Sequence, residues 1–165
     1  MSNFLALDFE TADNGADSAC AIGLVRVEDN QIVQRDHYLI RPPRRQFMFT
    51  HIHGITWQDV SNQPCFGELW PTISPILEGI DFIAAHNASF DQRVLYACCD
   101  SYNLARPPHR FVCTVQLARK VWKLHPTKLP NVCQFLGIEL DHHQALSDAT
   151  ACAQVVIAAH QYQHQ

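Results

Sequence analysis

The sequence predicts an α/β fold, in which a mixed β-sheet of about five strands is flanked by α-helices. Two observations support this fold class. Strand patterns come first, and helical patterns alternate with short strands afterwards. Consecutive strands favour antiparallel pairing, whereas the later alternation is typical of parallel strands with helices on the faces of the sheet. The length of 165 residues suits one domain, which we expect to span residues 1–165.

Three strands are predicted in the opening segment. They cover residues 4–11, 19–28 and 31–40. Asp29-Asn30 favours a tight turn between the second strand and the third. A segment rich in proline and arginine, residues 41–45, then ends the strand pattern and begins a loop that we expect to reach residue 56. Thr56 is suited to cap a short helix that continues through Asp59.

Helices and short strands alternate in the rest of the chain. Apolar residues recur at helical spacing over residues 66–77, where Pro75 should interrupt the helix. Short strands are expected at 81–85 and 111–113, and each leads into a helix, the second of which Thr114 is expected to cap. The last two predicted helices cover residues 129–136, ending at Gly137, and residues 145 to about 162.

Composition excludes several classes of protein. The chain is 47% hydrophobic and 17% charged, and no apolar run approaches the length of a membrane span, about 18 residues. Its seven cysteines lack a Cys-x-x-Cys pair and have mostly apolar neighbours, so we expect free thiols rather than disulfides or structural zinc. No signal segment is recognisable at the start, and the expected location is the cytoplasm.

The first predicted strand ends in two carboxylates. Residues two apart on a strand share a face, so Asp8 and Glu10 project together while Phe9 points the other way. Two like charges held this close repel unless a cation lies between them, and carboxylate oxygens are good ligands for Mg²⁺ or Mn²⁺. An isolated pair of this kind more often marks a strand that leaves the core for solvent, so further acids must decide.

Two further acids stand where such a site needs them. Asp91 falls in the first turn of the helix after strand 81–85, near the carboxyl end of that strand, where sites in α/β sheets gather. Asp148 lies at the start of the last helix, five residues after His143, so both side chains can reach the same place. Four acids in a metal site would also account for the formal net charge of −4.

In this arrangement the chain resembles the DnaQ-like family of 3′–5′ exonucleases, in the subgroup that has a histidine in its third motif. The matching motifs are residues 7–11, 86–91 and 143–148, with familiar intermediate segments at residues 53–56 and 113–119. The resemblance covers residues 4 to about 158 and implies a ribonuclease H-like sheet. Ala12 departs from the pattern, because many members carry a second threonine there, which bears on substrate contacts and not on metal ligands.

The resemblance implies metal-dependent hydrolysis from the 3′ end of DNA, with release of nucleoside 5′-monophosphates. Asp8, Glu10 and Asp148 would hold the ion that activates water, and Asp8 would bridge to a second ion. Asp91 would support that second ion directly or through water. His143 would be the general base, because imidazole titrates near the operating pH. The expected cofactors are therefore two Mg²⁺ or Mn²⁺ ions per site.

The same resemblance suggests how a strand end is held. The residues expected to contact substrate are Phe9 through its backbone, Thr11, Ile55, His86, Asn87 and Phe90. Ile55 and Phe90 would pack on unstacked bases, although Phe90 fits a core position equally well. We expect His142 to be a plain loop residue, and His51 and His53 to shape their loop rather than bind metal.

The most basic segment contains Arg119, Lys120, Lys123 and Lys128. Lysine and arginine along one edge can follow the phosphates of a nucleic acid, but a solvated helix face has the same composition. The sequence leaves both interpretations open.

Two other functions also stay open. A relative that trims RNA would use the same chemistry, although members specific for small oligoribonucleotides typically carry Tyr where His143 stands. A nucleic-acid-binding module without catalysis would have no chemical reason to retain all five catalytic residue types. The expected partner is a single-stranded or frayed 3′ end of DNA, with RNA as the alternative. A homodimer, or a polymerase or repair partner, is left open, and no membrane association is expected.

Overall fold

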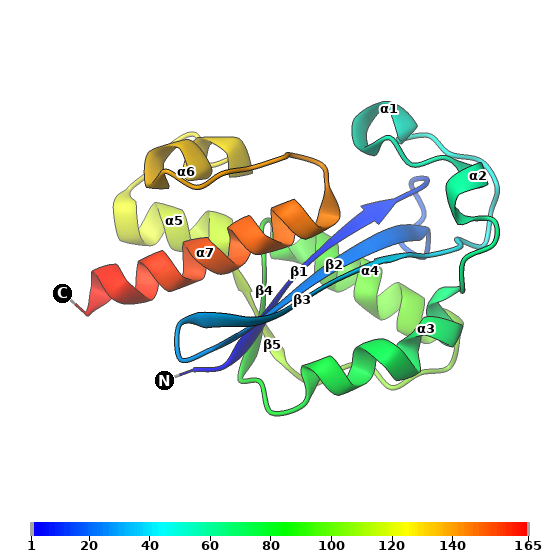
Figure 1. Cartoon of the computed structure of the whole chain (residues 1–165), viewed down its shortest axis with the longest axis horizontal. Coiled ribbons are helices and arrows are strands. Elements are labelled where there is room, and N and C mark those ends of the chain that lie inside the picture. Colours follow the sequence, from blue (N-terminus) through cyan, green and yellow to red (C-terminus); the bar gives the residue numbers. More distant parts are fainter. Residues whose placement is uncertain (1, 165) are drawn as a thin grey trace.

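The computed structural model describes residues 2–164 and contains a mixed five-stranded sheet (Figure 1). The strands are β1 (Phe4–Thr11), β2 (Ala19–Glu28), β3 (Gln31–Leu39), β4 (Phe82–Ala85) and β5 (Arg110–Cys113), and their order is β3-β2-β1-β4-β5. β1, β2 and β3 pair antiparallel, whereas β4 lies parallel to β1, and β5 parallel to β4. The predicted α/β class and mixed sheet are confirmed.

Helices connect these strands and cover both faces of the sheet (Figure 1). Between β3 and β4 lie α1 (Thr50–His53), α2 (Trp57–Val60), α3 (Phe66–Ile73) and the 3-10 helix η1 (Ser74–Leu77). α4 (Ala88–Ser101) joins β4 to β5, and α5 (Thr114–Trp122), α6 (Leu129–Leu136) and α7 (Ala145–Gln163) follow β5. The parallel strands are thus linked through helices, as the alternating patterns predicted.

Local signals account for several helix boundaries. The backbone N–H of Thr56 donates a 2.9 Å hydrogen bond to the carboxylate of Asp59, which caps α2 as expected. Pro75 coincides with the change from α3 to the 3-10 geometry of η1, as predicted. Gly137 follows α6 in the left-handed conformation, with a φ of 71°.

Two local predictions were wrong. Residues 50–53 form the single turn of α1 inside the segment expected to be a loop. Thr114 is the first helical residue of α5, and Cys113 stands at the capping position instead. The hydroxyl of Thr114 is engaged with the ring of His86, 2.8 Å away, so a tertiary contact takes the group that the local pattern assigned to the cap.

The two faces of the sheet bury separate hydrophobic cores. Leu5, Leu7 and Phe9 of β1 pack in one core with residues of α3 and α4. Phe4 and Ala6 belong to the other core, to which α7 contributes Ala149, Cys152, Ala153 and Val156. Because side chains alternate along a strand, Asp8 and Glu10 continue the row of Phe4 and Ala6 on the face that α7 covers.

α7 crosses β1 and β2 at close range (Figure 1). Its sheet-facing side chains are mostly small, and Gly23 of β2 stands where α7 begins. A Cβ atom at Gly23 would overlap the carbonyl of Ala145. The missing side chain therefore allows the start of α7, and with it Asp148, to approach the sheet.

Two expectations from composition can be checked within residues 2–164. All seven cysteines are unpaired, and Cys20, Cys98, Cys99, Cys133 and Cys152 are buried, so the expectation of free thiols is confirmed. None of the helices in this range combines the length and the apolar character that crossing a bilayer requires.

Replacing Gly23 with alanine should destabilise the protein by about 1–3 kcal/mol, because overpacked sites in protein cores cost this much. Urea denaturation measures the change as a shift in midpoint. The control is Val33→Thr in β3, where the side chain is 53% exposed and strand propensity is kept, and the expected change is less than about 0.5 kcal/mol. A Gly23→Ala protein as stable as its parent would contradict the close packing of α7 on β2.

Candidate active site

The carboxylates of Asp8, Glu10 and Asp148 meet at one end of β1. Each offers an oxygen, and these three oxygens lie within 4.8 Å of one another. The parallel register of β1 with β4 ends at Ala6 opposite Ala84, whereas β1 continues beyond it. The end of β1 is therefore open on the side that β4 vacates, and the start of α7 brings Asp148 to it.

Asp91 reaches this region from α4, on the opposite face of the sheet. Its side chain is buried, and Oδ1 accepts a 3.0 Å hydrogen bond from the backbone N–H of Phe9. That N–H is available because β4 has already ended. Asp91 is thus fixed next to the residue between Asp8 and Glu10, but it lies outside the group of three oxygens. The backbone at Phe9 was expected to contact a nucleotide, and its N–H is already engaged by Asp91.

The loop before α7 wraps around Asp148. The backbone N–H of His143 donates to Oδ2 of Asp148 at 3.1 Å, and Nδ1 of His142 lies 3.3 Å from Oδ1. The two imidazole rings stack, with centroids 3.7 Å apart. The expectation that His142 is a plain loop residue was wrong, because a φ of 69° at His143 turns the backbone so that both residues face Asp148.

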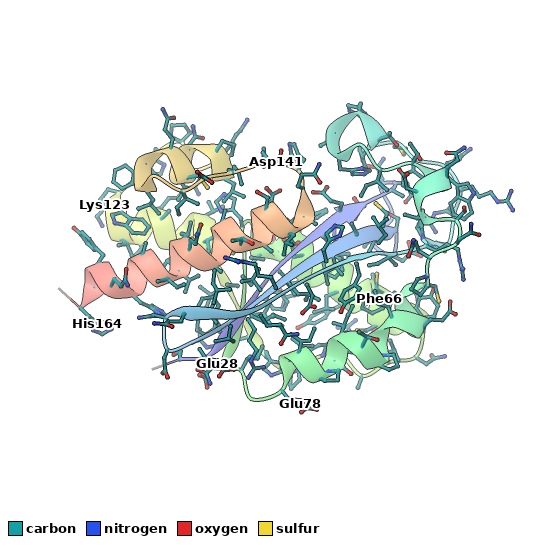
Figure 2. The ribbon with its side chains drawn as sticks, in the orientation of Figure 1. Glu28, Phe66, Glu78, Lys123, Asp141 and His164 are labelled. Atoms are coloured by element: carbon teal, nitrogen blue, oxygen red, sulfur yellow. The ribbon has the colours of Figure 1, made fainter. Side chains whose placement is uncertain are left out.

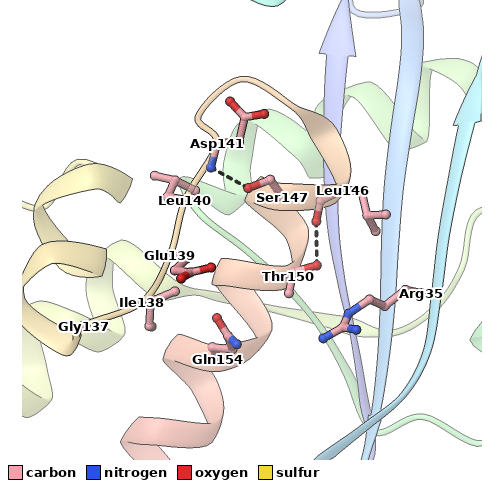
Figure 3. Close-up of a pocket in the computed structure, with 10 residues that line it drawn as sticks. All are labelled: Arg35, Gly137, Ile138, Glu139, Leu140, Asp141, Leu146, Ser147, Thr150 and Gln154. Atoms are coloured by element: carbon pink, nitrogen blue, oxygen red, sulfur yellow. Dashed lines mark hydrogen bonds between the residues drawn. The ribbon is translucent and has the colours of Figure 1, made fainter.

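A serine that the sequence did not single out fixes this loop. Oγ of Ser147 accepts a 2.8 Å hydrogen bond from the backbone N–H of Asp141, as Figure 3 shows. The bond ties the loop to the first turn of α7. A separate hollow of about 800 Å³ opens there, between this loop and Arg35 of β3 (Figure 3). Through this bond, Ser147 helps to fix the loop that carries His142 and His143.

The acids are held where their charged forms are unfavourable. Burial, and then the neighbouring carboxylates, raise the pKa of Asp8 well above its ordinary value. Burial also raises the pKa of Asp91. Burial, followed by the charge of Asp148, raises the pKa of Glu10 to about 8. The pKa of Asp148 is raised by burial, although contact with His142 opposes this. The cluster therefore needs protons or a cation.

These residues fit a hard divalent cation. Oδ2 of Asp8 is buried and accepts no hydrogen bond from residues 2–164. A buried carboxylate oxygen without a partner is costly, and a metal ion would supply the missing interaction. Carboxylate oxygens are the ligands that Mg²⁺ and Mn²⁺ prefer. Asp8, Glu10 and Asp148 thus form a suitable ligand set, with Asp91 beside it.

A hollow of about 690 Å³ opens beside the acids. Five of the residues expected to contact substrate line it, namely Phe9, Thr11, His86, Asn87 and Phe90. Within residues 2–164, Ile55 lies outside this hollow and packs against Ala12, Cys20 and Val60. The structure therefore does not bring Ile55 together with the other five.

His86 braces one wall of the hollow. Its Nε2 lies 2.9 Å from the carbonyl oxygen of Thr127, which can only accept, so Nε2 carries the proton. Nδ1 then accepts from the hydroxyl of Thr114 at 2.8 Å. Burial lowers the pKa of His86, which favours this neutral form. The two ring nitrogens thus link the end of β4 to Thr114 of α5 and to Thr127 before α6.

His53 holds the end of β1 through both of its ring nitrogens. Its Nε2 donates to the carbonyl oxygen of Thr11 at 2.9 Å, and Nδ1 accepts from the backbone N–H of Ile55 at 3.0 Å. Burial lowers the pKa of His53. The prediction that His53 shapes its loop is confirmed, and the contact also fixes the end of β1.

Comparison with known proteins decides the family. A sequence profile described as RNase_T, exonuclease, matches residues 5–156. The chain belongs to this exonuclease family. The DnaQ-like resemblance inferred from the three motifs is thereby confirmed, and the family generally uses divalent metal ions.

Relatives with curated sequences include two bacterial enzymes. A DNA polymerase III PolC-type from Thermotoga petrophila is 34% identical over 160 residues, covering 94% of this chain and 12% of that protein. Exodeoxyribonuclease 10 from Escherichia coli is 34% identical over 147 residues, covering 82% of this chain and 59% of that protein. The chain thus spans only part of the length of both relatives.

Solved structures of exonucleases share the fold. Exonuclease X in complex with 5′ overhanging duplex DNA matches with a TM-score of 0.79 and 27% identity, over 98% of this chain and 93% of that one. The nuclease domain of 3′hExo, a DEDDh family member bound to rAMP, matches with a TM-score of 0.83, 18% identity, and coverage of 97% and 92%. The expected ribonuclease H-like arrangement is confirmed.

The acid cluster predicts how stability depends on pH without divalent ions. Glu10 has a pKa of about 8 in the folded protein and an ordinary value of 4.5, so the folded state binds a proton that the unfolded chain has released. The free energy of unfolding should therefore fall as the pH rises from 4.5 to about 8. Urea denaturation in a chelator, across this range, measures the effect.

Asp8→Asn is the matched control for this experiment. Buried histidines such as His53 have lowered pKa values and act in the opposite direction, so the difference between parent and variant isolates the acids. The variant should gain stability relative to the parent as the pH rises. Parallel pH profiles for the two proteins would contradict repulsion within the cluster.

Proposed function

We propose that this chain is a 3′–5′ exonuclease that shortens single-stranded or frayed 3′ ends of DNA and releases nucleoside 5′-monophosphates. The observation that carries the proposal is the clustering of the carboxylates of Asp8, Glu10 and Asp148, next to His143 and an open hollow. One oxygen of this cluster, Oδ2 of Asp8, is buried without a hydrogen-bond partner among the described residues. Phosphodiester hydrolysis needs an activated water and stabilisation of negative charge on oxygen, which such a site can provide.

The acids would act as ligands for two Mg²⁺ or Mn²⁺ ions. When bound, these ions would supply an activated water and stabilise the leaving 3′ oxygen. Asp8, Glu10 and Asp148 would hold one ion, and Asp8 would bridge to the second. Asp91 would support the second ion directly or through water. Its Oδ1 already accepts a hydrogen bond from the Phe9 N–H, so this contact would use Oδ2. The rigid attachment of Asp91 keeps the end of β1 in place.

His143 would accept the proton of the attacking water. Burial, together with the neighbouring His142, lowers the pKa of His143 below its ordinary value, so the imidazole is neutral and able to accept a proton near pH 7. Its backbone N–H is anchored on Asp148, while its side chain lines the hollow. The proton acceptor is therefore held beside the proposed metal ligands.

DNA is the proposed substrate because of the named relatives. Exodeoxyribonuclease 10 is 34% identical, and the matching structure of exonuclease X contains overhanging duplex DNA. An exonuclease that trims RNA remains the alternative, since the residues around the acids engage phosphate and metal in both cases. A binding module without catalysis is disfavoured by the convergence of four acids and His143. Phe90, Asn87 and Thr11 would contact the terminal nucleotide.

Association with other proteins is part of the same proposal. The PolC-type relative is a polymerase, so a polymerase or repair partner is the expected kind of assembly, with a homodimer as the alternative. We also infer that residues 1–165 form one exonuclease domain, because the family match covers residues 5–156. A cytoplasmic location agrees with seven unpaired cysteines.

Digestion of matched DNA and RNA oligonucleotides, labelled at the 5′ end, tests the proposed activity. With Mg²⁺ the DNA should shorten one nucleotide at a time from its 3′ end, and excess chelator should abolish the reaction. Asp148→Ala should slow hydrolysis by several orders of magnitude, because a metal ligand is lost, with no loss of thermal stability. Undiminished hydrolysis in chelator, or an Asp148→Ala protein that is both inactive and unfolded, would count against the metal site.

His143→Ala should slow hydrolysis by roughly 10²- to 10⁴-fold, the usual contribution of a general base. In the parent enzyme the rate should rise with pH through the titration of His143, at a pH below its ordinary pKa of 6.5, and then level. Single-turnover rates between pH 5 and 8 measure both effects, and the rise should flatten in the variant.

His164→Ala provides the matched control, since His164 lies at the far end of α7 (Figure 2). Its rate and pH profile should equal those of the parent. Full activity with an unchanged pH profile in His143→Ala would remove this histidine from the mechanism.

A further inference from the structure

Two cationic side chains line the hollow without an anionic partner. They are Arg119 of α5 and Lys128, which directly precedes α6. Within residues 2–164, neither forms an ion pair with a carboxylate, whereas Arg26, Arg44 and Arg106 all do. In a chain with a formal net charge of −4, two unpaired cations in the same hollow as the acid cluster indicate a binding role for an anion.

Arg119 is held in a fixed orientation. Its Nε donates a 2.8 Å hydrogen bond to Oγ1 of Thr127, a residue that is only 4% exposed. The carbonyl oxygen of Thr127 in turn accepts from His86. The guanidinium is therefore anchored through one nitrogen, and its two terminal nitrogens have no partner among the described residues. A planar group presented in this way suits a phosphate.

The structure separates these two residues from the rest of the basic segment. All four cationic residues are exposed, but in the described part of the chain Lys120 and Lys123 lie outside the hollow. Figure 2 shows Lys123 at the end of α5 farthest from the loop that carries Asp141. The phosphate interpretation of the segment therefore applies to Arg119 and Lys128, and the solvated-face interpretation to the two other lysines.

We propose that Arg119 and Lys128 bind the phosphate that precedes the scissile one in the strand being shortened. This inference rests on the proposed function. The terminal nucleotide of a 3′ end carries a single phosphate, which is the scissile one, and it would lie at Asp8, Glu10 and Asp148. A second phosphate in the same hollow must therefore belong to the strand that is retained. Arg119 and Lys128 thus hold the retained strand while its terminal nucleotide is removed.

A single uncharged linkage tests this assignment. The substrates are two pentadeoxynucleotides with a 5′ label, one unmodified and one with a methylphosphonate at the second linkage from the 3′ end. With the parent enzyme and Mg²⁺, the methylphosphonate should raise KM for removal of the first nucleotide by about tenfold, the loss of roughly one charged hydrogen bond, with kcat little changed. A third oligonucleotide, neutral at the third linkage, should behave as the unmodified one.

Variants connect the effect to the two residues. The double variant Arg119→Gln, Lys128→Ala should raise KM for the unmodified substrate and lose the discrimination against the methylphosphonate. The KM of the double variant should depend less steeply on salt concentration, because fewer phosphates are neutralised. Lys128→Arg should keep the discrimination. Lys120→Ala, which removes one positive charge from the same segment outside the hollow, should match the parent on every substrate.

The possible failures can be told apart. Three results would overturn the phosphate assignment while hydrolysis itself continues. The parent could show equal KM values for the unmodified substrate and the substrate modified at the second linkage. The double variant could keep the discrimination, or the effect could be confined to the third linkage. A parent enzyme that hydrolyses none of the three DNA substrates would instead contradict the proposed function. Loss of discrimination in Lys120→Ala would also overturn the assignment, since it would show a general charge effect.

Discussion

Burying like charges beside one another is the constraint on which this structure depends. Asp8, Glu10 and Asp148 have oxygens within 4.8 Å, and burial removes part of the water that would otherwise solvate them. The surrounding fold must hold these groups against their repulsion. It does so by placing them at the edge of two hydrophobic cores, one on each face of β1, so that moving an acid would disturb close packing.

Two neutral histidines add support without adding charge. His53 joins α1 to the end of β1, and His86 joins the end of β4 to α5 and to the loop before α6. Each uses one ring nitrogen as donor and the other as acceptor, which only the neutral form allows. Burial lowers the pKa of both residues and thereby preserves these bonds at neutral pH. The walls of the hollow are consequently fixed by uncharged contacts, and its field is set by the acids and by Arg119 and Lys128.

Features that depend on local pattern could be predicted from the sequence, and features that depend on distant contacts could not. Alternation in β1 placed Asp8 and Glu10 on one face, and the change from strand to helix placed Asp91 near them. The position of His142 escaped prediction because it follows from a left-handed backbone at His143, which few residues other than glycine adopt. The mistaken cap at Thr114 has a related cause: a threonine near a helix start suits a cap or a tertiary partner equally, and His86 decides between them.

The order of the acids along the chain has a consequence for synthesis in the cell. Asp8 and Glu10 are made first, but Asp148 arrives on α7 only after the whole sheet has been translated. The ligand set cannot assemble on the ribosome until that helix has emerged and docked against Gly23 of β2. A chain that stops before α7 therefore lacks Asp148, and with it the three-carboxylate cluster that the finished fold assembles.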